Sequence, residues 1–185
     1  EEEEGGGGEI VYNRVFQSRA LSGAGTVTFS QSIANDFDFT NVQLERIGTT
    51  DMPDSGSVTM QGVTSLVGVF GNGSSTSPME GKVDLMASFS EGSGSVSGRT
   101  YDIFIFTLVG EERYRFENLA ITLEQTSISG GGFSGATSSS DPLMSNGTYD
   151  GLFVGSDAQE AVGTYSFERL GAVWTGIFSA EEQTP

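Results

Sequence analysis

The chain has 185 residues, and its 25 acidic residues against eight lysines and arginines give a formal net charge of −17 at pH 7. Such a charge repels phosphate backbones and anionic membrane surfaces, which excludes nucleic acid as a partner. The chain has no cysteine, which excludes disulfides and thiol chemistry, and no histidine, which removes the commonest general base and metal ligand. It has no run of 18 apolar residues, which excludes a transmembrane helix.

The N-terminal third divides into a tether and a small appendage. Residues 1–9, "EEEEGGGGE", cannot pack against a core, so they predict a flexible tether; an expression remnant is the alternative. Strand-like segments follow, and the turn-rich stretch 48–56 marks a boundary. We therefore expect a small β-rich appendage over 10–56, ahead of a main body at 57–185.

The main body contains eight strand-like segments separated by short turns of Gly, Asn, Ser and Asp. These segments are 57–70, 81–92, 96–109, 113–128, 131–139, 145–155, 161–169 and 172–181. Regular short strands with local hairpins are typical of a sandwich or an up-and-down barrel. The segment at 113–128 has a mixed register, which predicts either a bulge or one solvated end.

Four glycines interrupt the predicted strands of the C-terminal third, where glycine normally weakens a sheet. They are Gly151, Gly155, Gly163 and Gly176. Glycine at such places lets a small barrel bend sharply, or lets an aromatic ring of the next strand lie over the backbone. This favours an all-β, eight-stranded antiparallel up-and-down barrel with the small N-terminal appendage beside it.

A motif in the same third resembles a known family. The segments "GLFVG" at 151–155, "AQE" at 158–160 and "GTY" at 163–165 supply Gly151, Phe153, Gly155, Ala158, Glu160, Gly163 and Tyr165. This hairpin is similar to the hallmark of the barrel domain of transferrin-binding protein B and its relatives among Gram-negative surface lipoproteins. Weaker similarity extends over about 57–183, so the resemblance concerns the C-terminal barrel domain only.

The resemblance implies a non-enzymatic binding module. Members of this family lie on the cell outer surface, anchored to the outer membrane or secreted, and they bind a protein or a small solute such as an iron or haem source. A lipid anchor ahead of the glycine-rich tether is implied by the resemblance alone. The larger members have two lobes, each with a barrel and a handle, whereas residues 10–56 leave room only for a reduced handle.

Candidate partner-binding residues lie in two places. Arg113 and Arg115, beside Tyr114, are clustered cations in an acidic chain: either neighbouring glutamates neutralise them or they present a basic spot to a partner. Asp157 and Glu160 flank the hallmark hairpin, where partner binding competes with turn and capping roles.

A weak calcium site is the one cofactor prediction. Residues 33–47 fit neither a strand period nor a helix period. If this segment is extended, Asp36 and Asp38 project from one face and could supply oxygen ligands to Ca²⁺. A solvated strand face is the alternative interpretation.

We predict recognition through the barrel-end loops 71–79, 109–113, 137–146 and 155–160, because loops on a rigid barrel commonly carry recognition. The alternative is a structural or assembly subunit of an extracellular surface layer or filament. An outer-membrane barrel is disfavoured because no continuous apolar band with aromatic girdles follows the strands. A small carboxylate enzyme is disfavoured by the absence of histidine. Whether the barrel is filled or hollow stays open.

Overall fold

The computed structural model describes residues 16–17, 24–30, 41–47, 52–74, 76, 79–91, 93–108 and 114–183. It describes the backbone alone in the strands before residue 48 and at 104–108, 114–117 and 156. The predictions at Asp36, Asp38 and Arg113 lie outside the described residues. Among the described residues, no helix has the length and apolarity needed to cross a membrane.

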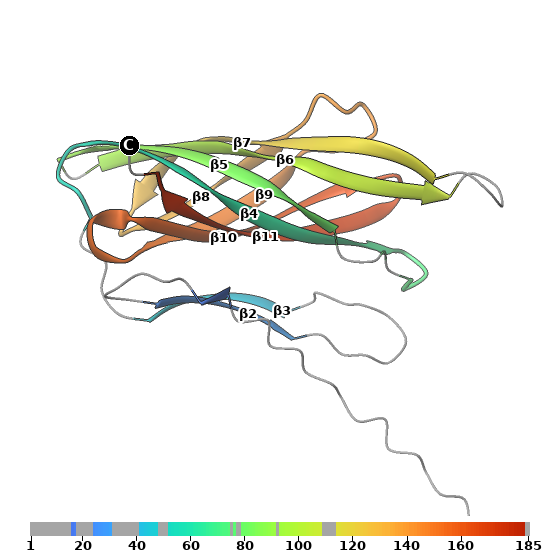
Figure 1. Cartoon of the computed structure of the whole chain (residues 1–185), viewed down its shortest axis with the longest axis horizontal. Coiled ribbons are helices and arrows are strands. Elements are labelled where there is room, and N and C mark those ends of the chain that lie inside the picture. The colour runs from blue at the N-terminus through green and yellow to red at the C-terminus, as the bar shows by residue number, and fades with distance from the viewer. Residues whose placement is uncertain are drawn as a thin grey trace, which may run out of the picture.

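Eight antiparallel strands close into a barrel in the order β10-β11-β4-β5-β6-β7-β8-β9, which confirms the predicted up-and-down architecture (Figure 1). Every strand pairs with its neighbours in the chain, and the last strand pairs with the first to close the sheet. The strands are β4 (Gly56–Phe70), β5 (Met79–Ser90), β6 (Ser93–Leu108), β7 (Tyr114–Ser129), β8 (Gly132–Ser138), β9 (Gly147–Val154), β10 (Glu160–Arg169) and β11 (Ala172–Glu182).

A separate antiparallel sheet precedes the barrel, in the order β1-β2-β3. Its strands are β1 (Phe16–Gln17), β2 (Ala24–Ser30) and β3 (Asn41–Ile47). The second half of the ambiguous segment 33–47 is therefore a strand. Strands β2 and β3 approach β9 and β10 of the barrel (Figure 1). The division of the chain into an appendage and a barrel domain stays a prediction, because much of 10–56 is not described.

The outer face of the barrel is apolar and buried on the side nearest this sheet. Strand alternation directs Val67, Val154, Val162 and Ile177 outward, yet none of them is more than 3% exposed. An outward-facing apolar row remains on a sheet only where another layer covers it. On β5 and on β6 as far as Tyr101 the outward residues are solvated and, except for Met86, polar, so the barrel has one covered side and one open side.

The barrel interior is filled by side chains. Large aromatic residues from neighbouring strands contact one another there, with ring centroids 5.1 Å apart for Phe133 and Phe153 and 5.7 Å apart for Phe89 and Phe153. Trp174 is 3% exposed and belongs to the same core. Eight strands enclose a space that side chains can fill, and the described core side chains pack against one another within it.

Five of the strand glycines lie directly opposite aromatic residues. Each ring covers the backbone of its partner glycine so closely that a Cβ atom on the glycine would collide with the ring. The cross-strand pairs are Phe133 with Gly151, Tyr149 with Gly135, Phe178 with Gly163, Tyr165 with Gly176 and Trp174 with Gly68. At Gly163 a Cβ would lie 2.1 Å from Phe178 Cζ. The prediction that an aromatic ring lies over these backbones is confirmed for Gly151, Gly163 and Gly176.

The prediction that Gly155 lies within a strand is wrong. β9 ends at Val154, and Gly155 starts the turn to β10 with a φ of 83°. Asp157 and Ala158 follow with φ values of 57° and 55°. Gly155 is therefore needed for its backbone conformation, which side chains rarely adopt, and not to admit a ring.

Two bulges interrupt the pairing of β6 with β7. Between Thr100 and Ile103, β6 contains one residue more than β7, and Asp102 has a φ of 54°. Nearer the other end, the extra residue is on β7, between Leu123 and Thr126. Each bulge shifts the inward-facing row by one residue, but β7 has none between Glu117 and Leu119, where the mixed register of the sequence would place it.

Candidate binding surfaces

The open side of the barrel carries the exposed positive charges of the described surface. Among the described side chains three are cationic: Lys82 and Arg99 are each 61% exposed, whereas Arg169 is 4% exposed. Lys82 on β5 and Arg99 on β6 project from the same outer wall, because their strands are neighbours and both positions face away from the core.

These two cations form one cluster with Asp84, Tyr101 and Asp102. The Arg99 Nε and Nη2 atoms donate to Asp84 Oδ2 over 3.2 and 3.0 Å, and the Tyr101 hydroxyl donates to Asp84 Oδ1 over 3.1 Å. The guanidinium lies 4.6 Å from the centroid of the Tyr101 ring, a cation–π contact. Lys82 Nζ donates to Asp102 Oδ2 over 2.8 Å, and this hydrogen bond raises the pKa of Lys82. Partial burial, followed by the bond to Asp84, raises the pKa of Tyr101.

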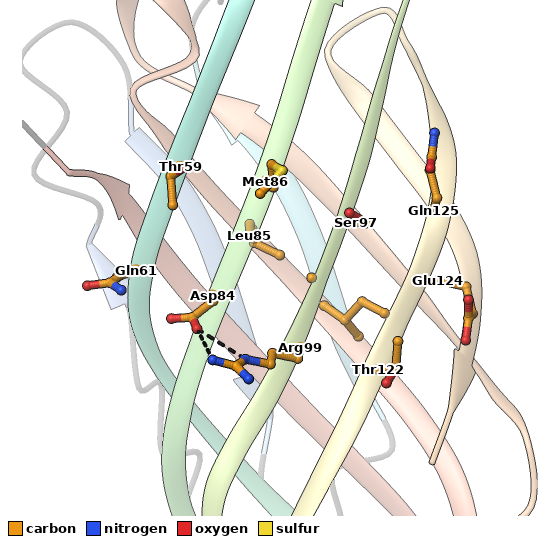
Figure 2. A pocket seen from close by; sticks show the side chains of 12 residues that line it. Thr59, Gln61, Asp84, Leu85, Met86, Ser97, Arg99, Thr122, Glu124 and Gln125 are labelled. Atoms are coloured by element: carbon orange, nitrogen blue, oxygen red, sulfur yellow. Dashed lines mark hydrogen bonds and ion pairs between the residues drawn. The ribbon is translucent and has the colours of Figure 1, made fainter. Parts of the chain in front are cut away.

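A hollow of about 560 Å³ lies on this wall beside the Asp84–Arg99 pair (Figure 2). Its sides come from β4, β5, β6 and β7, and Met86, which is 61% exposed, gives it an apolar surface. The polar side chains around it supply both donors and acceptors, and include Gln61, Asp84, Arg99, Thr122, Glu124 and Gln125. We call this the wall hollow.

Sequence reasoning identified the outward row of β5 but not this cluster. Lys82, Asp84 and Met86 alternate with core residues in the sequence, so they are predicted to share a face. On the next strand, Arg99 and Tyr101 alternate with core-facing residues in the same way. The pairing of Lys82 with Tyr101 and of Asp84 with Arg99 needs the hairpin register, which the sequence leaves open.

The long connections gather at one end of the barrel. In an up-and-down barrel successive connections alternate between ends. The predicted recognition loops 71–79, 109–113 and 137–146 therefore share the end that also holds the turn from β10 to β11, whereas 155–160 lies at the opposite end. We call the shared end the loop end. The predicted recognition loop 155–160 therefore lies apart from the loop end.

Exposed apolar side chains concentrate at the loop end. Four of the six large apolar side chains that are exposed on the described surface are here: Phe70 (38%), Leu143 (51%), Leu170 (60%) and Val173 (51%). Leu170 has a φ of 53° and Gly171 a φ of 77°, and together they connect β10 to β11 as a two-residue turn. Such turns favour Asn-Gly or Gly-Gly, and the corresponding turn from β7 to β8 is formed by Gly130 and Gly131. An exposed leucine in a left-handed conformation is therefore costly to the fold and has no packing role to explain it.

A buried ion pair holds the loop between β8 and β9 against this end. Arg169 Nε donates to Asp141 Oδ2 over 2.7 Å, and the Leu143 backbone N–H donates to Asp141 Oδ1 over 2.9 Å. The bond from Arg169, followed by the bond from Leu143, lowers the pKa of Asp141. The loop therefore presents Leu143 from a fixed position beside a second hollow of about 430 Å³.

The two acidic residues of the hallmark hairpin differ in exposure. Asp157 is exposed at the tip of the turn, whereas Glu160 is 2% exposed and accepts a hydrogen bond from Ser179 Oγ over 3.3 Å. Glu160 thus lies beneath the surface, in contact with its neighbouring strand, which favours a structural role for it. The exposed position of Asp157 is compatible with a turn role and with contact to a partner.

The other members of the hallmark belong to the core. Phe153 and Ala158 are fully buried and Tyr165 is 1% exposed. The Tyr165 hydroxyl lies 2.8 Å from Thr64 Oγ1, which in turn donates to the Ile177 carbonyl over 2.6 Å. Burial raises the pKa of Tyr165 to about 12. The motif therefore specifies how β9, β10 and β11 pack together.

The remaining predicted residues are placed only in part. Tyr114 and Arg115 begin β7 at the loop end, where the backbone alone is described, and Arg113 lies outside the described residues. The calcium prediction at Asp36 and Asp38 also lies outside them. Within the part of the chain that the structure describes, no group of three or more acidic, histidine or cysteine side chains is arranged to hold a metal ion.

Solved structures provide the comparison with known proteins. No family model matches the sequence, and no curated protein matches it either. The transferrin-binding protein B of serogroup B Neisseria meningitidis is similar over 95% of this chain and 36% of its own, at 16% identity and a TM-score of 0.54. The intact Ap-TbpB, with N and C lobes, is similar over 90% of this chain and 34% of its own, at 16% identity and a TM-score of 0.59. A protein described as a surface lipoprotein is similar over 87% of this chain and 75% of its own, at 15% identity and a TM-score of 0.51. The chain thus spans about a third of the length of the first two, and it has the fold of a transferrin-binding protein B-like barrel.

Proposed function

We propose that this chain is a non-enzymatic binding module of the cell outer surface, anchored to the outer membrane or secreted, which recognises a protein partner through the loop end of its barrel. One observation carries the proposal: exposed apolar side chains gather at the end of a filled barrel that also bears the long loops. Exposed apolar groups on a soluble surface commonly mark a protein contact. The proteins of similar fold described as transferrin-binding or as a surface lipoprotein support it.

The filled interior favours a protein partner over a small solute held within the barrel. Tyr114 and Arg115 start β7 at this same end, so the predicted basic spot, with Arg113, would adjoin the apolar side chains. The chain's net charge of −17 favours a partner with a basic surface around its apolar contact. Leu170 is the side chain of the loop end that we expect to contribute most to the contact, because it is the most exposed and is held in a costly conformation.

The test is capture from host serum and from spent medium by the immobilised chain, with the bound proteins identified by mass spectrometry. We expect specific proteins to be retained by the wild-type chain and lost by Leu170→Asn, since asparagine suits the left-handed backbone and removes the apolar group. The matched control is Val63→Asn, which removes an apolar side chain of 54% exposure from the wall of β4. Equal capture by Leu170→Asn, or self-association with nothing else retained, would exclude this proposal; the second result would favour the structural subunit.

A further inference from the structure

The wall hollow lies on a different face from the loop end, and we propose that it is a second binding site, for an uncharged oligosaccharide. The inference rests on four properties of the described residues: where the hollow lies in the sheet, how its charges are matched, which hydrogen-bonding groups it leaves without partners, and where its apolar surface lies. It is independent of the protein contact proposed for the loop end.

The position of the hollow excludes recognition through the backbone. It lies across β4, β5, β6 and β7, each of which is paired on both sides within the closed barrel. A peptide that adds a strand needs an exposed sheet edge, and a closed barrel has none. A ligand must therefore be recognised by side chains alone, over a broad and open surface.

The one positive charge of the hollow is already matched within the protein, and Glu124 leaves a single negative charge there. Asp84 accepts hydrogen bonds from Arg99 and from Tyr101, and Glu124 accepts one from the Ser138 hydroxyl. The one arginine of the hollow is neutralised by Asp84, and the chain as a whole repels anions. A phosphate or sulfate group therefore finds no uncompensated positive charge here, and no group of three or more acidic side chains among the described residues is arranged to hold a metal ion, which favours an uncharged polar ligand.

The hollow retains many hydrogen-bonding groups without partners. Gln61, Gln125, Thr122 and Ser97 make no side-chain hydrogen bond to the described part of the chain, although each can both donate and accept. Arg99 uses only Nε and Nη2 in its contacts, so further guanidinium donors remain. These mixed donors and acceptors complement the hydroxyl groups of a sugar, each of which is likewise a donor and an acceptor.

The arrangement forms two rows across the strands. Figure 2 shows Gln61, Asp84, Arg99 and Thr122 in one row, each from a different strand, with Thr59, Met86, Ser97 and Gln125 in the next. Met86 places an apolar surface between polar neighbours, as the C–H faces of a sugar ring require. The bulge on β7 exposes both Glu124 and Gln125 at one side of the hollow. The Tyr149 hydroxyl donates to the Glu124 carbonyl from within the barrel, which fixes the backbone there.

The test is binding of the fluorescently labelled full chain to a printed array of neutral, sialylated and sulfated oligosaccharides at about 0.15 M salt, followed by calorimetric titration of the best neutral binder. We expect neutral oligosaccharides to be bound. Arg99→Ala should weaken the affinity by about tenfold or more, because it removes charge-assisted hydrogen bonds. Arg99→Lys should also weaken it, since an ammonium cannot replace the planar donors.

Lys82→Ala is the matched control, because it removes a cation of equal exposure from the same wall, and Lys82, although on the same strand as Asp84, does not line the hollow. It should leave the affinity unchanged, as should Leu170→Asn at the loop end. Gln125→Ala is a second test variant that removes an exposed side chain with no partner and so preserves the fold. Absence of neutral binders, binding to sulfated oligosaccharides alone, or affinity unaltered in both Arg99→Ala and Gln125→Ala would overturn the proposal while leaving the loop-end contact untouched.

Discussion

The covering of glycine by an aromatic ring predicts that Gly176→Ala strongly destabilises the barrel. A Cβ at this position would lie 2.2 Å from Tyr165 Cζ and 2.5 Å from its hydroxyl oxygen. The ring cannot move aside easily, because it is buried, stacks on Phe167 at a centroid distance of 6.3 Å and is bonded to Thr64. One of these contacts must be lost or the strands must separate.

The expected cost follows from two effects. Overpacking of a close-packed core costs about 1–3 kcal/mol, and loss of the Tyr165–Thr64 hydrogen bond adds about 1 kcal/mol. The smaller backbone entropy of alanine in the unfolded chain offsets about 0.5–1 kcal/mol. We therefore expect Gly176→Ala to lower the free energy of unfolding by about 1–3.5 kcal/mol, a substantial part of the stability of an ordinary domain.

Urea unfolding followed by the fluorescence of Trp174, the one tryptophan, measures this directly. The matched control is Gly71→Ala, because no atom lies within 4 Å of the Cβ position there, and it should change stability by less than about 0.5 kcal/mol. In a double-mutant cycle, Tyr165→Leu should cost less in the Gly176→Ala background than in the wild type. Equal stability of Gly176→Ala and Gly71→Ala would refute the reasoning.

Three further predictions concern other described residues. Leu170→Asn should raise the free energy of unfolding by about 1 kcal/mol in the same urea experiment, because it relieves a left-handed leucine; a loss of stability would contradict this. Asp141→Asn should lower it by about 2 kcal/mol, because it removes the charge-assisted hydrogen bond to the buried Arg169. The pKa of Asp141 is lowered in the folded state, so its contribution is present above the ordinary value of 3.8 and is lost as the pH falls below it; stability profiles of the wild type and Asp141→Asn should converge in acid. Burial raises the pKa values of Tyr149 and Tyr165 to about 12, so ultraviolet titration should show them ionising after ordinary phenols, and stability should fall as the pH rises above 10.

Alternation and turn chemistry were enough to predict the eight barrel strands. In β5, for example, Val83, Leu85 and Ala87 alternate with polar residues, and that row is the buried one. The glycines of β9 to β11 predicted rings over the backbone because glycine within a strand has few other uses. These features are local, since each depends on one strand or one pair of neighbours.

The wall hollow could not be predicted in the same way. Its floor and sides combine four strands whose mutual register depends on two bulges, and a bulge moves every later side chain to the other face. The exposed side chain of Leu170 was missed for a different reason: the segments 161–169 and 172–181 place this residue in a turn, but a leucine there does not indicate a left-handed backbone, because its propensity for it is unfavourable. The burial of Glu160 could not be predicted from the sequence either, since a glutamate beside a turn is normally solvated.

The pairing of rings with glycines also affects how the chain selects its strand register. Alternation of polar and apolar residues rejects a slip by one residue but tolerates a slip by two, which keeps every side chain on its proper face. A slip by two would place Phe178 opposite Tyr165 or Ala161 instead of Gly163, where no backbone gap can receive the ring. Several such pairs around the barrel therefore raise the energy of misregistered hairpins together. They favour one strand register in a sheet whose surface carries many serines and threonines.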